Sequence, residues 1–285
     1  MADFCCYHDW GIGIATINGV SMVINIIHLI TIAAMESLKG LPYRWILIHI
    51  TLADIGSALT LTAAYICLPG FVLISKLTPN TRPLSALIMW PQYMSYWIFL
   101  IASIERYYGI CRPLLYSAST FTQRLSWILA LTWLLNGSLT AVVVALNLLT
   151  LNNLTIYIQV SQIFFLGDRY VPLLVSAIPL FKIIKELIRM RGRSLAGEDT
   201  QIRRASVYLI IIYSLFIFFS MFDLVMSSID IMYPDLIPFR AERLRNITKP
   251  LYGIINTVIY GLRSKAYRTQ LRKMFCRENR VATTW

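Results

Sequence analysis

Residues 10–35 read WGIGIATINGVSMVINIIHLITIAAM, and no charged side chain occurs between Asp9 and Glu36. A helix needs about 20 mostly apolar residues to cross the hydrocarbon layer of a lipid bilayer. This stretch therefore predicts a membrane-spanning helix over about 11–35. The distances between charged residues measure the other apolar stretches of the chain in the same way.

The composition of the whole chain agrees with a membrane protein. Of its 285 residues, 57% are hydrophobic and 14% are charged, whereas soluble domains carry about 25% charged residues. The net charge of +12 suits either a nucleic acid or a membrane as partner, and its placement around apolar stretches favours the membrane and no nucleic acid. The five cysteines form no CxxC pair, which argues against a zinc site.

The uncharged stretches predict an all-α membrane protein with a bundle of seven transmembrane helices. The predicted spans lie at about 11–35, 43–67, 84–109, 124–148, 159–184, Arg204 to Tyr233, and 244–262. The fifth span either begins before Asp168 or draws Lys182 to the interface, where a lysine can extend its charge into water. The sixth span must carry Asp223 and Asp230, and the seventh must carry Lys249.

A short amphipathic helix is predicted to follow the last span, from Ser264 to Cys276. Its apolar face consists of Tyr267, Leu271, Met274 and Phe275, and its basic face of Lys265, Arg268, Arg272 and Lys273. A helix with one apolar and one basic face is typical of a helix that lies in the membrane interface and contacts lipids.

Lys and Arg residues are divided unequally between the two sides of the predicted bundle. The loops after spans one, three and five and the C-terminal segment hold 19 of them, and the opposite side holds 7, with Arg169 counted as a loop charge. Because the positive side of a membrane protein faces the cytoplasm, we expect an extracellular tail at 1–10, a membrane domain at 11–262, and a cytoplasmic helix and tail at 263–285.

Two polar features lie where apolar residues are expected. Asp54 falls in the middle of the second span, where an unpaired charge costs roughly 3 kcal/mol or more, so it is expected to face the bundle interior. It is either a packing residue held by hydrogen bonds or a site for an ion or proton. Glu105-Arg106-Tyr107 lies at the end of the third span, and by itself it is only a pair of charges near the interface.

The motifs around these residues carry a family resemblance. They are Leu52-Ala53-Asp54, Glu105-Arg106-Tyr107 with Gly109-Ile110-Cys111-Arg112-Pro113-Leu114, Trp133, and Asn256-Thr257-Val258-Ile259-Tyr260. Asp54 and Arg106 are 52 residues apart, and Arg106 and Trp133 are 27 apart. In order and spacing, residues 11–276 resemble the rhodopsin-like (class A) G-protein-coupled receptors. The closing stretch 259–265 is similar to odorant-type chemoreceptors.

The resemblance implies a receptor of the plasma membrane that passes an extracellular ligand signal to heterotrimeric G proteins and catalyses no covalent reaction. It assigns Glu105, Arg106, Tyr107 and Tyr260 to the coupling switch. In the resting receptor Glu105 would hold Arg106, and on activation Arg106 would turn toward Tyr260 and the G protein.

The resemblance also implies an allosteric sodium ion at Asp54. Its polar cluster would consist of Asn25, Asp54, Ser95 and Asn256, with Asn25 within one residue of the family position. Oxygen ligands around one carboxylate suit a small hard cation. No other cofactor is expected.

For the ligand pocket, the corresponding positions are Ile88, Gln92, Phe222, Asp223 and Lys249. The ligand would be a small molecule or a peptide. Ile88 stands where amine receptors of the family carry an aspartate, which argues against a biogenic amine. Phe222 stands in place of the family's span-six tryptophan. The outer disulfide of the family is missing, because Thr81 occupies the span-three position and residues 149–167 contain no cysteine.

Two modification sites and two rival classes complete the expectations. Cys276 stands where the family carries a lipidated cysteine, and Asn153 begins an Asn-Leu-Thr sequence for glycosylation in an outer loop. An opsin is one rival, although Lys249 lies seven residues before Asn256 and the retinal lysine of the family lies six before. A transporter is the other, although no internal repeat is visible.

The charges near the seventh span allow two interpretations. Lys249 could pair with Asp223 or Asp230 as a structural bridge, which leaves the outer arginines solvated. Alternatively, the arginines could steer an anionic ligand toward the pocket. These arginines are Arg240, Arg243 and Arg245.

Overall fold

The computed structural model describes residues 2–67, 82–118, 120–149, 154–191, 198–232 and 239–275. These ranges fold into helices joined by short turns, and they contain no β-strand. Seven of the described helices have 25 or more residues: α1 (Ala2–Ala34), α2 (Tyr43–Cys67), α3 (Arg82–Cys111), α6 (Leu125–Leu149), α7 (Leu154–Arg191), α8 (Glu198–Met232) and α9 (Phe239–Arg263).

Shorter helices occupy the connections. They are the 3-10 turn η1 (Glu36–Leu38), α4 (Pro113–Ala118), α5 (Thr120–Gln123) and α10 (Lys265–Phe275). Between η1 and α2 the chain turns at Gly40, whose φ of +82° is strained for residues with a side chain.

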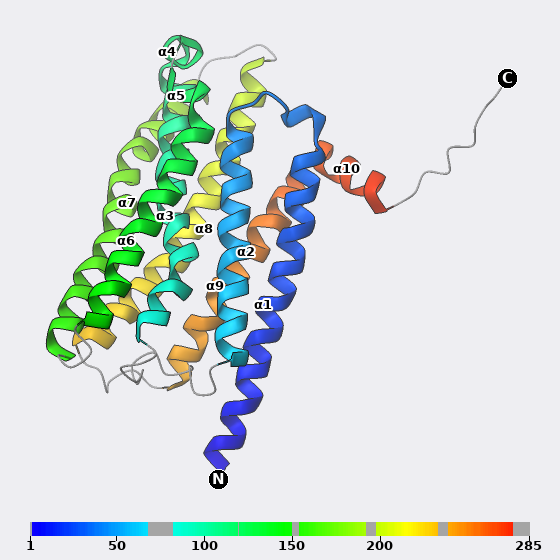
Figure 1. The fold of residues 1–285 in the computed structure, drawn as a ribbon. Coiled ribbons are helices and arrows are strands. Elements are labelled where there is room, and N and C mark those ends of the chain that lie inside the picture. The colour runs from blue at the N-terminus through cyan, green and yellow to red at the C-terminus, as the bar shows by residue number, and fades with distance from the viewer. Residues whose placement is uncertain are drawn as a thin grey trace.

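The long helices lie side by side as a bundle, with α3 in its interior (Figure 1). α3 contacts α2, α6, α7 and α8. In α3, 72% of the apolar stretch is buried, whereas 22–33% of the apolar stretch is buried in α1, α2 and α6. Side chains of α3 therefore meet most of the other helices, and any polar group on α3 needs a partner inside the bundle.

By length and composition, four of the described helices can cross a membrane, through Ile12–Ala34, Tyr43–Ile66, Ala86–Cys111 and Leu125–Leu146. A shorter apolar stretch, Ile210–Met226, lies in α8. Large apolar side chains also face outward, among them Trp127 with 77% of its surface exposed, Phe181 with 71% and Phe218 with 69%. Such a surface suits lipid hydrocarbon and not water, so the chain is an all-α membrane protein.

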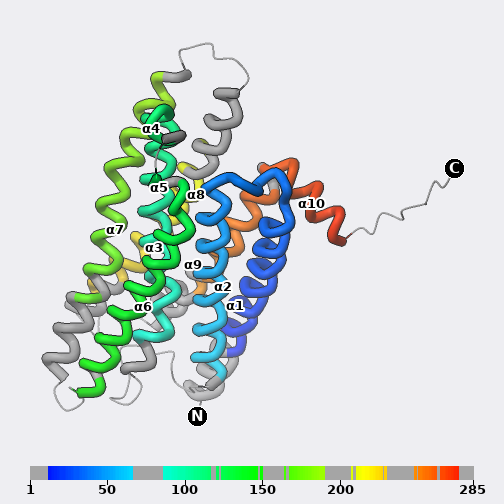
Figure 2. Tube along the Cα trace, turned by 45° about the horizontal axis from the view of Figure 1, so that its top comes forward, coloured from blue at the N-terminus to red at the C-terminus, as the bar shows by residue number. Residues whose placement is uncertain are grey.

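α10 leaves the bundle axis and turns outward beside α1 (Figures 1 and 2). Ser264 precedes it and accepts a hydrogen bond from the backbone N–H of Tyr267 at 3.2 Å, the usual role of a helix N-cap. The hydroxyl of Tyr267 and Nδ1 of His28 on α1 are 2.9 Å apart, and Thr31 donates to Sδ of Met274 at 3.8 Å. The predicted amphipathic helix is therefore present, and its apolar face packs on α1.

Candidate functional site

At the C-terminal end of α3, Glu105 and Arg106 form an ion pair within one turn. Nε of Arg106 lies 2.5 Å from Oε2 of Glu105, and Nη2 donates to Oε1 at 2.6 Å. The Glu105 side chain is completely buried, and 12% of the Arg106 side chain is exposed. A buried carboxylate needs such a partner, because removing one member of a buried pair costs about 3–5 kcal/mol.

Two tyrosines from neighbouring helices complete this pair. The hydroxyl of Tyr116 on α4 donates to Oε1 of Glu105 at 2.6 Å. Burial and the neighbouring Glu105 carboxylate raise the pKa of Tyr116, so its hydroxyl keeps the proton that it donates. On the other side, the guanidinium of Arg106 lies 5.1 Å from the ring centre of Tyr43, within reach of a cation–π interaction.

Tyr260 joins the same group through Tyr43, because the two hydroxyls are hydrogen-bonded. Tyr107, the third residue of the predicted motif, does not join it. Its ring lies 5.3 Å from the ammonium of Lys182 on α7 and so faces another helix. The sequence pointed to neither Tyr43 nor Tyr116.

Asp54 lies inside the bundle, as its position in the middle of a span predicts. Asn256 on α9 is close enough to stabilise the Asp54 carboxylate, although neither Nδ2 nor Oδ1 of Asn256 makes a hydrogen bond of good geometry. Gly253 makes this approach of α9 possible, since a Cβ there would lie 3.2 Å from Nδ2 of Asn25 and 3.4 Å from Cγ of Asp54. The structure thus brings three residues of the predicted polar cluster to one place.

Asn25 belongs to the junction of α1 and α9. Its amide donates to the carbonyl of Ser21 at 2.9 Å, and its Oδ1 accepts a hydrogen bond from Thr257 at 3.1 Å. These contacts occupy both the amide nitrogen and the amide oxygen of the Asn25 side chain, and Asn25 is not among the residues that line the cavity described below. Asn25 therefore joins the helices that carry the cluster and is not itself a cavity-lining residue.

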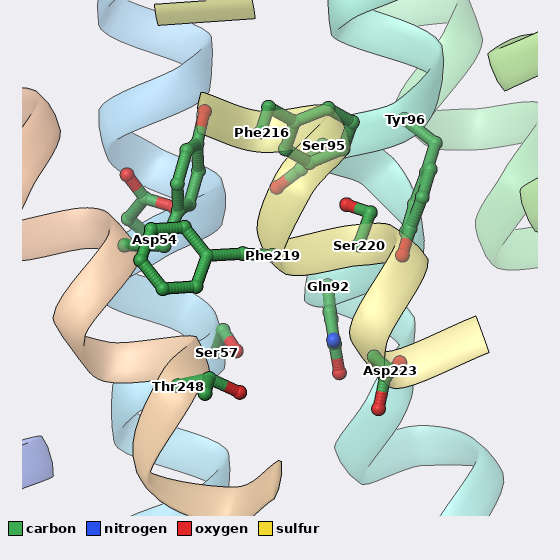
Figure 3. A pocket seen from close by; sticks show the side chains of 11 residues that line it. Asp54, Ser57, Gln92, Ser95, Tyr96, Phe216, Phe219, Ser220, Asp223 and Thr248 are labelled. Atoms are coloured by element: carbon green, nitrogen blue, oxygen red, sulfur yellow. The ribbon is translucent and has the colours of Figure 1, made fainter. Parts of the chain in front are cut away.

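A cavity of about 50 Å³ lies between α2, α3, α8 and α9 (Figure 3), room for a few water molecules or a small group. Two carboxylates line it, those of Asp54 and Asp223. Five side chains contribute hydroxyl or amide groups: Ser57, Gln92, Ser95, Ser220 and Thr248. Four aromatic rings complete the lining: Tyr96, Phe216, Phe219 and Tyr252.

Two of the predicted pocket residues, Gln92 and Asp223, line this cavity. Ile88 does not, and packs in a separate apolar cluster with α2. Phe222 is not among the lining residues either; the aromatic rings that α8 presents there are Phe216 and Phe219. Phe216 stacks on Phe99, with ring centres 4.2 Å apart, which fixes the wall of the cavity.

Asp223 pairs with Arg169, and this corrects the count that treated Arg169 as an outer loop charge. Arg169 lies inside α7, 4% exposed, and its Nη1 donates to Oδ2 of Asp223 at 2.8 Å. Its Nη2 donates to the hydroxyl of Tyr93 at 3.1 Å, and its guanidinium lies 4.8 Å from the Tyr93 ring centre. No motif around either residue indicates this pair.

A second buried carboxylate, Asp168, stands next to Arg169 in the chain but outside the cavity lining. It accepts a hydrogen bond from Nε1 of Trp97 at 2.5 Å and two from Nδ2 of Asn136 at 3.0 Å. These contacts tie α7 to α3 and α6, so Asp168 is a structural carboxylate.

Several predicted residues lie outside the part of the chain that the structure describes. They are Asn153 and Cys276, and the side chains of Asp230, Arg240, Arg243, Arg245 and Lys249. Their predicted roles in glycosylation, lipidation, ligand binding and ligand steering stay predictions.

Comparison with protein-family models gives no match, and comparison with curated proteins gives none either. The fold and the site therefore define the class only as an all-α membrane protein with a buried polar cavity and an ion pair at the end of its central helix.

The cluster around Asp54 fits a small cation. The carboxylate of Asp54, the hydroxyl of Ser95 and the unpartnered Oδ1 of Asn256 are hard oxygen donors of the kind that sodium prefers. Within the described ranges, no three His, Cys, Asp or Glu residues come together as a group that could hold a metal ion.

We expect sodium chloride to raise the unfolding temperature of the purified protein relative to potassium chloride at equal ionic strength. Binding to the folded state alone stabilises it, and each kcal/mol corresponds to about 2–4 °C for a chain of this size. Asp54→Asn should remove the difference, and Asp168→Asn, a buried carboxylate outside the cavity, should keep it. An equal sodium effect in wild type and Asp54→Asn would contradict the site.

Proposed function

We propose that the chain is a rhodopsin-like G-protein-coupled receptor with seven membrane spans. Under this proposal α7, α8 and α9 cross the membrane beside the four helices that are apolar enough by composition. The N-terminus is extracellular, the C-terminus is cytoplasmic, and the receptor acts at the plasma membrane. The excess of Lys and Arg in the loops that follow spans one, three and five supports this orientation.

The observation that carries the proposal is the environment of Arg106. Its guanidinium lies between Glu105, which binds it, and Tyr43, whose hydroxyl leads to Tyr260. An arginine between two sets of partners has two stable positions, and a partner protein can favour one of them. The ion pair to Glu105 corresponds to the resting position.

α9 provides a physical connection between the cavity and this switch. Thr248, Tyr252, Asn256 and Tyr260 follow one another at intervals of four residues, so they share one face of the helix. Thr248 and Tyr252 line the cavity, Asn256 faces Asp54, and Tyr260 reaches Tyr43. A ligand that shifts α9 at the cavity would therefore move the partner of Arg106.

Glu105→Gln is expected to raise signalling without ligand, because the neutral amide holds Arg106 less strongly and frees it for the alternative position. The measurement is basal activation of a panel of chimeric G-protein α subunits in cells, normalised to surface expression. Glu186→Gln is the matched control, since Glu186 pairs with Arg189 near the surface of α7 and should leave the basal level unchanged. Unchanged signalling from Glu105→Gln at normal expression would argue against the proposal.

A further inference from the structure

The described lining of the cavity carries charge of one sign. Among the lining residues that the structure describes, Asp54 and Asp223 each contribute a carboxylate, and none is Lys, Arg or His. Oε1 of Gln92, a further acceptor, is buried and has no hydrogen-bond partner. A group that enters this cavity meets two carboxylates and a free amide oxygen, so a hydrogen-bond donor is favoured there, and so is a positive charge in surroundings of low dielectric constant.

The aromatic rings of the lining also favour a cation, in particular one that carries an alkyl group. Tyr252 stands between two phenylalanine rings, with centres 5.3 Å from Phe216 and 6.1 Å from Phe219. The face of an aromatic ring attracts cations, most strongly where water is excluded. A bare metal ion gains from the oxygens, whereas an alkylammonium group gains from both the oxygens and the rings.

We propose that the Asp223 end of the cavity binds the ammonium group of a small protonated amine, which takes over part of the interaction that Arg169 makes with Asp223. The proposal rests on the proposed receptor function, for which it names the ligand class. Asp223 is reached from the cavity on one side and from Arg169 on the other, so ligand and arginine compete for one carboxylate.

Arg169 still has interaction partners when the ligand binds the carboxylate of Asp223. Its guanidinium still lies over the Tyr93 ring and still donates to the Tyr93 hydroxyl. The charge therefore does not become isolated in a buried place, which would be strongly unfavourable. Because Arg169 belongs to α7 and Asp223 to α8, a weaker pair loosens the contact between these two helices.

This assignment differs from two expectations of the sequence. Ile88 stands in place of the aspartate that amine receptors of the family carry in span three, which argued against a biogenic amine, and one of the two interpretations of the outer arginines was that they steer an anion. The lining offers the carboxylate of Asp223 on α8 instead, while Ile88 is not among the lining residues and packs in a separate apolar cluster.

The test uses the full-length protein purified in lipid nanodiscs, in potassium chloride without sodium. Isobutylammonium is the probe, with isobutanol as the neutral molecule of the same shape and isobutyrate as an anion with the same isopropyl group. The unfolding temperature should rise with the amine and not with the other two. Arg169→Gln, which removes the competitor, should tighten the amine about tenfold, and Asp168→Asn should leave its binding unchanged.

Asp223→Asn should weaken the amine about tenfold or more. If this variant fails to fold, the neutral double variant Arg169→Gln/Asp223→Asn replaces it, and it should show no amine response. Stabilisation by isobutyrate, or by the amine in the double variant, would overturn the proposal. This assay contains no G protein and therefore tests the site alone. If the amine binds here but a separate assay detects no G-protein activation, the result counts against the receptor function and not against the site.

Discussion

Arg106→Ala, introduced into the Glu105→Gln background, is expected to return G-protein activation to the level of cells without receptor. In the proposed switch, only the guanidinium of Arg106 can leave Glu105 and move toward Tyr43 and Tyr260. Alanine leaves nothing that can occupy either position. Combining the two substitutions also avoids a buried glutamate without its arginine, which by itself would destabilise the protein.

The control for this experiment is Arg112→Ala in the same background. Arg112 is exposed just beyond the end of α3, so its loss removes a positive charge near the same surface without touching the ion pair. It should retain most of the raised basal activity. Equal activity of the two double variants, at equal surface expression, would mean that Arg106 has no special role.

The second large effect concerns folding. Arg169→Ala is expected to destabilise the protein by about 3–5 kcal/mol, because Asp223, with 3% of its side chain exposed, loses a buried partner. The loss should appear as a lower unfolding temperature and lower surface expression. Lys185→Ala, an exposed position on the same helix, should change stability by less than about 0.5 kcal/mol.

A second substitution separates this explanation from a general defect of α7. In Arg169→Met/Asp223→Asn neither position keeps a buried charge, and neutral replacements of a buried ion pair are often tolerated. This double variant should therefore be more stable than Arg169→Ala. If the double variant is no better, the destabilisation comes from packing around Arg169 and the ion pair is not its cause.

The bounds of some helices could be predicted from the sequence, because charged residues rarely lie inside an apolar span. The predicted span 43–67 matches α2 (Tyr43–Cys67), and 124–148 differs from α6 (Leu125–Leu149) by one residue. α1 begins at Ala2 and not near residue 11. Hydropathy measures the hydrocarbon layer, whereas the hydrogen bonds of a helix continue beyond it.

Contacts between helices could be predicted only where a motif placed them. Asp54 and Asn256 were expected together from the family resemblance, and they face each other. Arg169 and Asp223 are 54 residues apart in the chain, and nothing in either local sequence indicates the other. Tyr43 and Tyr116 could not be predicted as site residues, because tyrosines are common at the ends of membrane helices and their presence there does not indicate a particular role.

Guanine-nucleotide exchange on purified heterotrimeric G proteins tests the central claim most directly. The wild-type chain, Glu105→Gln and Glu105→Gln/Arg106→Ala are reconstituted in nanodiscs at equal concentration and assayed with a panel of α subunits. The receptor proposal predicts faster exchange with Glu105→Gln than with wild type on at least one α subunit, and exchange at the receptor-free rate with the double variant. Exchange at the receptor-free rate with all three folded proteins, across the whole panel, would contradict it.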